Sequence, residues 1–195
     1  MAFVTKFNNL SNNGEANQAN FAIAVNKAHE QLKSLGASSA YSTNEKKNIA
    51  SKSALSTRAA IEKQISSVLN HVSLEQENVK SATKRALASD WSSSAQAIVA
   101  IELSKDGKRA ISSLTDKNSL TALASLPEAI TGLSKETLDN ARNAYVMTNH
   151  PEIQKSIDNY KADLLLVDSM LKINEDISGS YKKYSSAEIE TITAI

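Results

Sequence analysis

Apolar residues recur every three or four positions along most of the chain, which is the pattern of one face of an α-helix. The first such stripe predicts a helix over about 15–35, ended by Gly36 as a C-cap. Residues 1–14 lack this periodicity and are rich in Asn, so we expect an irregular N-terminal arm there. The stripe of the first helix consists of Phe21, Val25, Ala28, Leu32 and Leu35.

The longest stripe predicts a helix over about 43–88, roughly 65 Å long if unbroken. Ser42 and Glu45 fit a capping box at its start. Its apolar positions follow heptad spacing over more than four repeats, which is typical of coiled-coil-like packing against another helix. The seam residues expected to contact that helix are Ile61, Ile65, Val68, Val72 and Val79.

Two features of this stripe leave alternatives open. Arg58 and Glu75 interrupt the apolar seam. Each is either a charge at a core position that sets register or oligomeric state, or a point where the seam is not buried. Ser73, followed by Glu75 and Gln76, could also start a second helix, so a break near 72 is the alternative to one continuous helix.

Closely spaced start and stop residues over about 90–133 predict a cluster of short helices, one of them capped by Asn118. Ser134 is expected to cap the next helix. A last long helix is predicted over about 151–177, ended by Gly179, with 179–195 as a C-terminal tail. Its expected buried stripe is Ile153, Ile157, Tyr160, Leu164, Val167 and Leu171, and its second half is apolar on more than one face.

These elements predict an all-α fold: a helical bundle over 15–178 with long coiled-coil-like helices and a cluster of short ones. The five Gly and two Pro among 195 residues favour long uninterrupted helices. A net charge of +1, from 22 basic and 21 acidic residues, gives no electrostatic case for wholesale nucleic-acid or membrane binding. The N-terminus lacks the pattern of a signal peptide, and no run of about 18 apolar residues is present to span a membrane.

Candidate chemistry is sparse. The three histidines, His29, His71 and His150, lack metal-ligand spacing, and there is no Cys. Glycine-rich phosphate loops and nucleophile elbows are missing from the sequence. The carboxylates of the last long helix, including Asp163, alternate with lysines as on a solvated face. We therefore expect a protein that is not an enzyme, with no catalytic, cofactor-binding or metal-binding residues.

The two ends of the chain hold apolar and basic residues in segments too short to fold alone. We expect contact arms that become ordered on a neighbouring subunit, the alternative being that they fold back onto their own bundle. The pattern at 181–184 also resembles that of single-strand nucleic-acid binders, although a solvated lysine face is favoured. The candidate contact residues are Phe3, Phe7, Tyr181, Lys182, Lys183, Tyr184 and Ile195.

The segment 122–152 contains Leu-Ala-Ser-Leu-Pro-Glu-Ala-Ile-Thr-Gly-Leu-Ser-Lys-Glu-Thr at 123–137 and His-Pro-Glu at 150–152. It resembles small helical proteins encoded among the structural genes of tailed bacteriophages. The resemblance implies a virion component, such as a head, neck or internal protein, located in the virion or the host cytoplasm. Its partners would be copies of itself or another virion or assembly protein. The alternatives are a helical regulator or inhibitor docking on a host or phage enzyme, and a nucleic-acid-binding bundle.

Overall fold

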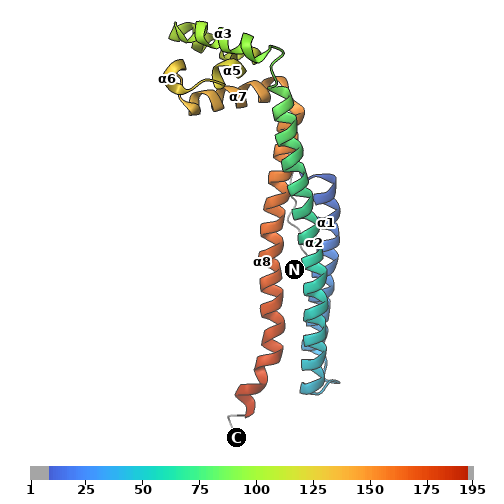
Figure 1. Ribbon diagram of the computed structural model, residues 1–195. Coiled ribbons are helices and arrows are strands. Elements are labelled where there is room, and N and C mark those ends of the chain that lie inside the picture. Colours follow the sequence, from blue (N-terminus) through green and yellow to red (C-terminus); the bar gives the residue numbers. More distant parts are fainter. Residues whose placement is uncertain (1–8, 193–195) are drawn as a thin grey trace. The chain divides into compact units, whose positions relative to one another are not determined.

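The structure is a computed structural model that describes residues 9–192, with side chains described as far as Lys182, and every regular element in that range is helical (Figure 1). The all-α class and the helical bundle with long helices are therefore confirmed. The elements are α1 (Asn12–Ala37), α2 (Thr43–Ala86), α3 (Ser93–Ser104), α4 (Gly107–Ser112), η1 (Ser113–Thr115), α5 (Lys117–Ala124), α6 (Glu128–Thr131), α7 (Lys135–Asn149) and α8 (Pro151–Ile192).

The chain divides into two compact units. Unit one comprises Met1–Leu74 and Asn159–Ile195, and unit two comprises Glu75–Asp158. The division thus falls inside the segment 15–178 that the sequence pattern presents as one bundle. Heptad spacing shows which residues share one face of a helix. It does not show where along the helix one set of contacting elements gives way to another.

The first helix begins earlier than expected, so the predicted arm over 1–14 is wrong for residues 12–14. Ser11 is the N-cap residue, and its hydroxyl oxygen accepts a hydrogen bond from the Gly14 N–H at 2.9 Å. A serine at this position satisfies one of the free N–H groups of the first turn. Phe3 and Phe7 lie outside the described residues.

Asp163 on α8 fixes this start of α1. Its carboxylate accepts hydrogen bonds from the Ser11 N–H at 3.1 Å and from the Ser11 hydroxyl at 2.6 Å. The side chain is fully buried, so placing Asp163 on a solvated face was wrong. A buried carboxylate is costly unless it is hydrogen-bonded, and the backbone and side chain of Ser11 provide those bonds.

α2 is one continuous helix, so the alternative of a break near Ser73 is wrong. The predicted capping box at its start is confirmed. The Ser42 N–H donates to Glu45 Oε2 at 2.8 Å, and the Glu45 N–H donates to Ser42 Oγ at 3.3 Å. The hydrogen bonds from Ser42 hold the pKa of the Glu45 carboxyl below its usual value.

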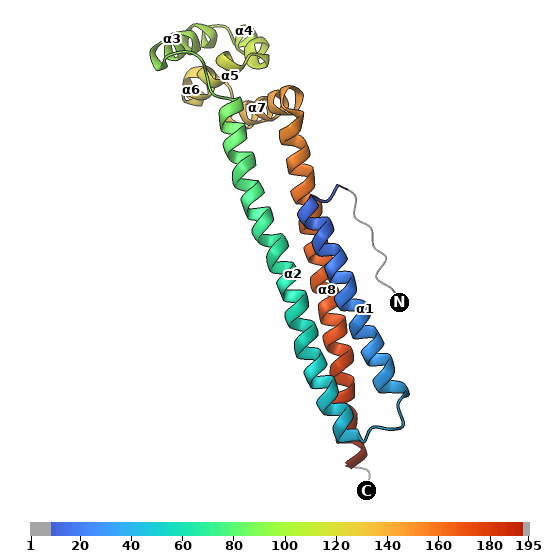
Figure 2. The ribbon, with the colours of Figure 1, turned by 90° about the vertical axis from the view of Figure 1, so that its right-hand side faces the viewer.

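The core of unit one joins α1, α2 and α8, and both ribbon views show α1 lying along the other two (Figure 2). The predicted stripe of α1 enters this core, with Leu32 partly buried. The α2 seam is buried over four of its five residues, while Val79 is half-buried and belongs to unit two. The four buried seam residues are Ile61, Ile65, Val68 and Val72.

Arg58 lies outside the core, which decides between the two interpretations of this charge. It is exposed, and its Nε lies 2.6 Å from Glu62 Oε1. The buried positions of α2 in this region are Ser53 and Thr57. An α-helix of 3.6 residues per turn drifts against a strict heptad, so the buried face moves off the Arg58 position.

α8 continues through Gly179 to Ile192, so the predicted end at this glycine is wrong. An internal glycine costs a helix about 1 kcal/mol. The adjoining turns bury Ile177 and Tyr181, and burying such side chains contributes more than that. Residues 179–192 are therefore not a separate tail.

The predicted buried stripe of α8 is wrong at Leu164 and Leu171, which are exposed. Because the second half of this helix is apolar on several faces, its spacing does not select one of them. The face that α1 and α2 cover carries Ala162, Asp163, Leu166, Val167, Met170, Ile177 and Tyr181.

Unit two contains the predicted cluster of short helices. α3 packs on α5, and α4, α6 and α7 complete the group. Ser134 caps α7 as predicted, accepting from the Thr137 N–H at 3.1 Å. One buried apolar cluster of this unit consists of Leu103, Ala110, Leu123, Leu133 and Leu138.

Candidate functional site

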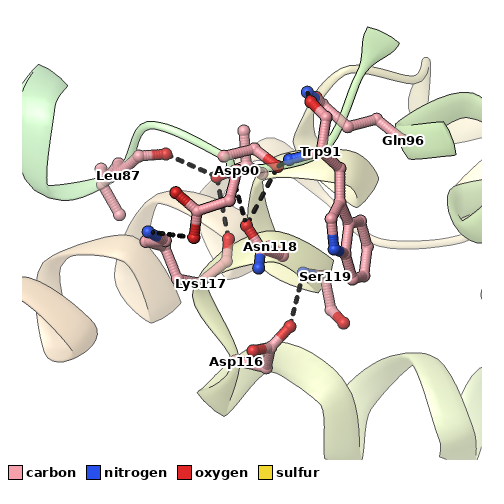
Figure 3. A network of polar contacts seen from close by, with 10 residues as sticks. Leu87, Asp90, Trp91, Gln96, Asp116, Lys117, Asn118 and Ser119 are labelled. Carbon is pink, nitrogen blue, oxygen red and sulfur yellow. Dashed lines mark hydrogen bonds and ion pairs between the residues drawn. The ribbon is translucent and has the colours of Figure 1, made fainter. Parts of the chain in front are cut away.

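A network of polar contacts connects the turn after α2 to the first turn of α5 in unit two (Figure 3). The prediction that Asn118 caps α5 is wrong, because Asp116 caps it by accepting from the Ser119 N–H at 2.7 Å. Asn118 Oδ1 instead accepts from the Ser89 hydroxyl at 3.0 Å and from the Asp90 N–H at 2.9 Å. The side chain of Asn118 thereby fixes a turn that is far away in sequence.

An ion pair borders this network. Lys117 Nζ lies 2.9 Å from Asp90 Oδ2, and hydrogen bonding to Lys117 holds the pKa of the Asp90 carboxyl below its usual value. The contribution of this ion pair to stability is therefore present at neutral pH, and it is lost as the pH falls through the lowered pKa of Asp90. Gln96 Nε2 donates to the Trp91 carbonyl at 2.9 Å. These groups bond to one another and to the backbone, so the network acts as a structural connection.

Asn118→Ala is expected to destabilise unit two by about 1–3 kcal/mol, because it removes the acceptor of two donors in this turn. The fluorescence of Trp91, the single tryptophan of the chain, reports on this unit during denaturation. Asn140→Ala, an exposed change on α7, is the control and should leave the transition unchanged. Equal transitions for the two variants would show that the Asn118 hydrogen bonds contribute nothing.

The candidate contact residues at the C-terminal end separate into different environments. Tyr181 is 3% exposed and packs in the core of unit one, so it is not a free arm. Its hydroxyl donates to Gln31 Oε1 at 3.2 Å, and burial raises the pKa of its phenol. Lys182 is exposed on α8. The side chains of Lys183 and Tyr184 and the residue Ile195 lie outside the described part of the chain.

The burial of Tyr181 bears on the nucleic-acid alternative. An aromatic ring that stacks on a base must present one of its faces to solvent. The ring of Tyr181 is enclosed by its own bundle, so it has no such face to offer. Two of the basic groups elsewhere are paired with acids on their own helix, Lys105 with Glu102 and Lys80 with Glu77.

A candidate site among the described residues is an open groove between α2 and α8 in unit one, which we name the α2/α8 groove. It consists of two adjoining hollows of about 670 Å³ and 360 Å³ that share Arg58, Ser178 and Lys182. Leu55 on the α2 wall is 70% exposed, and Leu171 on the α8 wall is 47% exposed. The α2 wall includes Leu55, Arg58, Glu62 and Ile65, and the α8 wall includes Leu171, Glu175, Ser178 and Lys182.

Unit two has smaller apolar features of its own. A hollow of about 460 Å³ lies against α7 and η1, with Leu114, Ala144 and Tyr145 among its lining residues. On α3, Ile98 and Ile101 are exposed and lie three residues apart on one face. The α3 face is short, and the hollow carries no charged side chain that would indicate the nature of a ligand.

The residues described here do not bring together three or more metal-ligating side chains of His, Asp or Glu in one place. Within the same part of the chain, no helix is both long enough and apolar enough to cross a membrane. Comparison of the chain with protein-family models, with curated proteins and with solved structures found no match in any of the three.

Proposed function

We propose that this protein is a non-enzymatic assembly protein that acts through helix-mediated protein–protein contacts. The observation that carries the proposal is the α2/α8 groove with its exposed leucines, Leu55 and Leu171. Transferring one exposed leucine side chain from water into an interface contributes about 1.5–3 kcal/mol. Apolar patches bordered by charged groups are characteristic of protein–protein contact sites.

The narrower proposal is that the assembly is the particle of a tailed bacteriophage, in which this chain is a head, neck or internal protein. Its support is the resemblance of residues 122–152 to small helical proteins of phage structural genes. In that setting the partners are copies of this chain or another virion protein.

Light scattering coupled to size-exclusion chromatography tests the general proposal. The protein should form a multimer of fixed size, and the pair of changes Leu55→Ser and Leu171→Ser should weaken it. Ile23→Ser on α1 is the matched control, because Ile23 is 67% exposed and does not line the groove. A wild-type monomer at every concentration would contradict self-assembly and favour the regulator that docks on an enzyme.

A further inference from the structure

The α2 wall of the α2/α8 groove carries a pattern that is complementary to its own reverse. Leu55, Arg58, Glu62 and Ile65 present an apolar, a basic, an acidic and an apolar residue at spacings of three, four and three. Because the spacings are symmetric, a second copy of this wall placed antiparallel aligns the exposed Leu55 of each copy with Ile65 of the other, which lines the groove but is itself only 7% exposed. The same alignment sets each Arg58 opposite a Glu62.

We propose that the occupant of the α2/α8 groove is the same face of a second copy of this chain, packed antiparallel to form an isologous dimer. This inference rests on the proposed function and names the partner at that site. In an isologous interface each contact occurs twice, so a single pair of opposite charges on one copy gives two pairs in the dimer.

The charges of the groove match this occupant. Arg58 and Glu62 lie 2.6 Å apart on one copy, and their side chains are 64% and 51% exposed, so both remain accessible to a second pair. The α8 wall adds one acidic and one basic residue, Glu175 and Lys182. Two bases and two acids balance, which suits a partner of the same mixed charge better than a strongly acidic or basic one.

The spacing of the walls indicates that the occupant is helical. On α8, Leu171, Glu175, Ser178 and Lys182 follow one another at intervals of four, three and four. The residues named for the α2 wall follow one another at intervals of three, four and three. Residues at these intervals form a continuous stripe along a helix, which is the surface that a further helix packs against in coiled-coil-like bundles.

A charge-reversal experiment tests the antiparallel pairing. A copy with Arg58→Glu presents two acids at these positions, and a copy with Glu62→Arg presents two bases. Each variant alone should dimerise at least about tenfold more weakly than wild type, because the pairing then opposes like charges. An equimolar mixture should recover wild-type association, because every acid then faces a base. The readout is the dimer dissociation constant from sedimentation equilibrium.

The controls separate folding and nonspecific charge effects from pairing. Both positions are exposed, so at a concentration where the wild type is monomeric each variant should keep its helical circular dichroism, with only the small loss of about 0.2–0.5 kcal/mol expected from the Arg58–Glu62 pair. Lys80→Glu reverses another exposed charge on α2, within unit two, and should leave the dimer unchanged.

Three results would overturn the inference. A mixture that associates no better than either variant alone excludes antiparallel pairing through the groove. If the wild type self-associates but neither reversal weakens it, assembly stands as the proposed function and the groove is not its interface. A monomeric wild type removes both the dimer and self-assembly.

Discussion

Val68→Asp is expected to destabilise the protein by about 3–5 kcal/mol, because it places an unpaired charge in the core of unit one. Val68 is fully buried at the centre of the α2 seam, where it meets residues of α1 and α8. An ionised carboxylate there loses its hydration without gaining a cation or hydrogen-bond donors. Removal of the valine side chain from the core adds a packing loss. Urea denaturation followed by circular dichroism measures the difference.

Asn70→Asp is the matched control for this experiment. It adds the same charge two residues further along α2 at an exposed position. The control should change stability by less than about 0.5 kcal/mol, as surface substitutions usually do. Similar losses for both variants would mean that the added charge, and not burial at Val68, is responsible.

Gly14→Ala should also destabilise the protein, although alanine is the better helix former by about 1 kcal/mol. A Cβ atom at position 14 would lie 2.1 Å from Asp163 Oδ1, far inside van der Waals contact. The Asp163 carboxylate cannot swing aside, because it is fully buried and held by two hydrogen bonds from Ser11. Overpacking costs about 1–3 kcal/mol, and each charge-assisted hydrogen bond that breaks adds about 1.5–3 kcal/mol. The steric effect therefore exceeds the gain in propensity.

A double-mutant cycle assigns that loss to the contact with Asp163. Asp163→Ala removes the carboxylate and should itself be destabilising, because the Ser11 donors then lack their acceptor. In that background Gly14→Ala should no longer destabilise the protein, since the clashing carboxylate is absent and the gain in helix propensity of about 1 kcal/mol is opposed only by the 3.3 Å approach to Leu10 Cβ. If Gly14→Ala lowers stability equally in both backgrounds, the loss does not come from the contact with Asp163. The coupling energy between the two substitutions is measured by thermal or urea denaturation.

Local sequence patterns identified the helices and most of the buried α2 seam. The capping pair Ser42 and Glu45 and the N-cap Ser134 are set by neighbours within four residues. The burial of the four seam residues follows from apolar spacing on a single helix face; they are Ile61, Ile65, Val68 and Val72. Both kinds of pattern are local, and the same is true of the closely spaced helix ends between about 90 and 133. Local hydrogen bonds and periodicity suffice to specify them.

Only part of the candidate site could be predicted from the sequence. Arg58 was identified as an interruption of the seam, but its exposure beside Glu62 depends on how far the buried face drifts along α2. The exposed leucines Leu55 and Leu171 follow from the choice of face that α1 covers. Tyr181, expected on a contact arm, is buried because α8 continues past Gly179 and carries it onto the core.

The sequence by itself determined the class of fold, the long helices and the α2 seam, because these depend on interactions between residues close together in the chain. The tertiary structure alone decided which face of α8 is buried and why residue 14 is a glycine. Ser11 and Asp163 are 152 residues apart, and no local pattern links them. A helix that is apolar on several faces can bury any of them, so the neighbouring helices select the face, and Leu171, which they leave exposed, lines the groove.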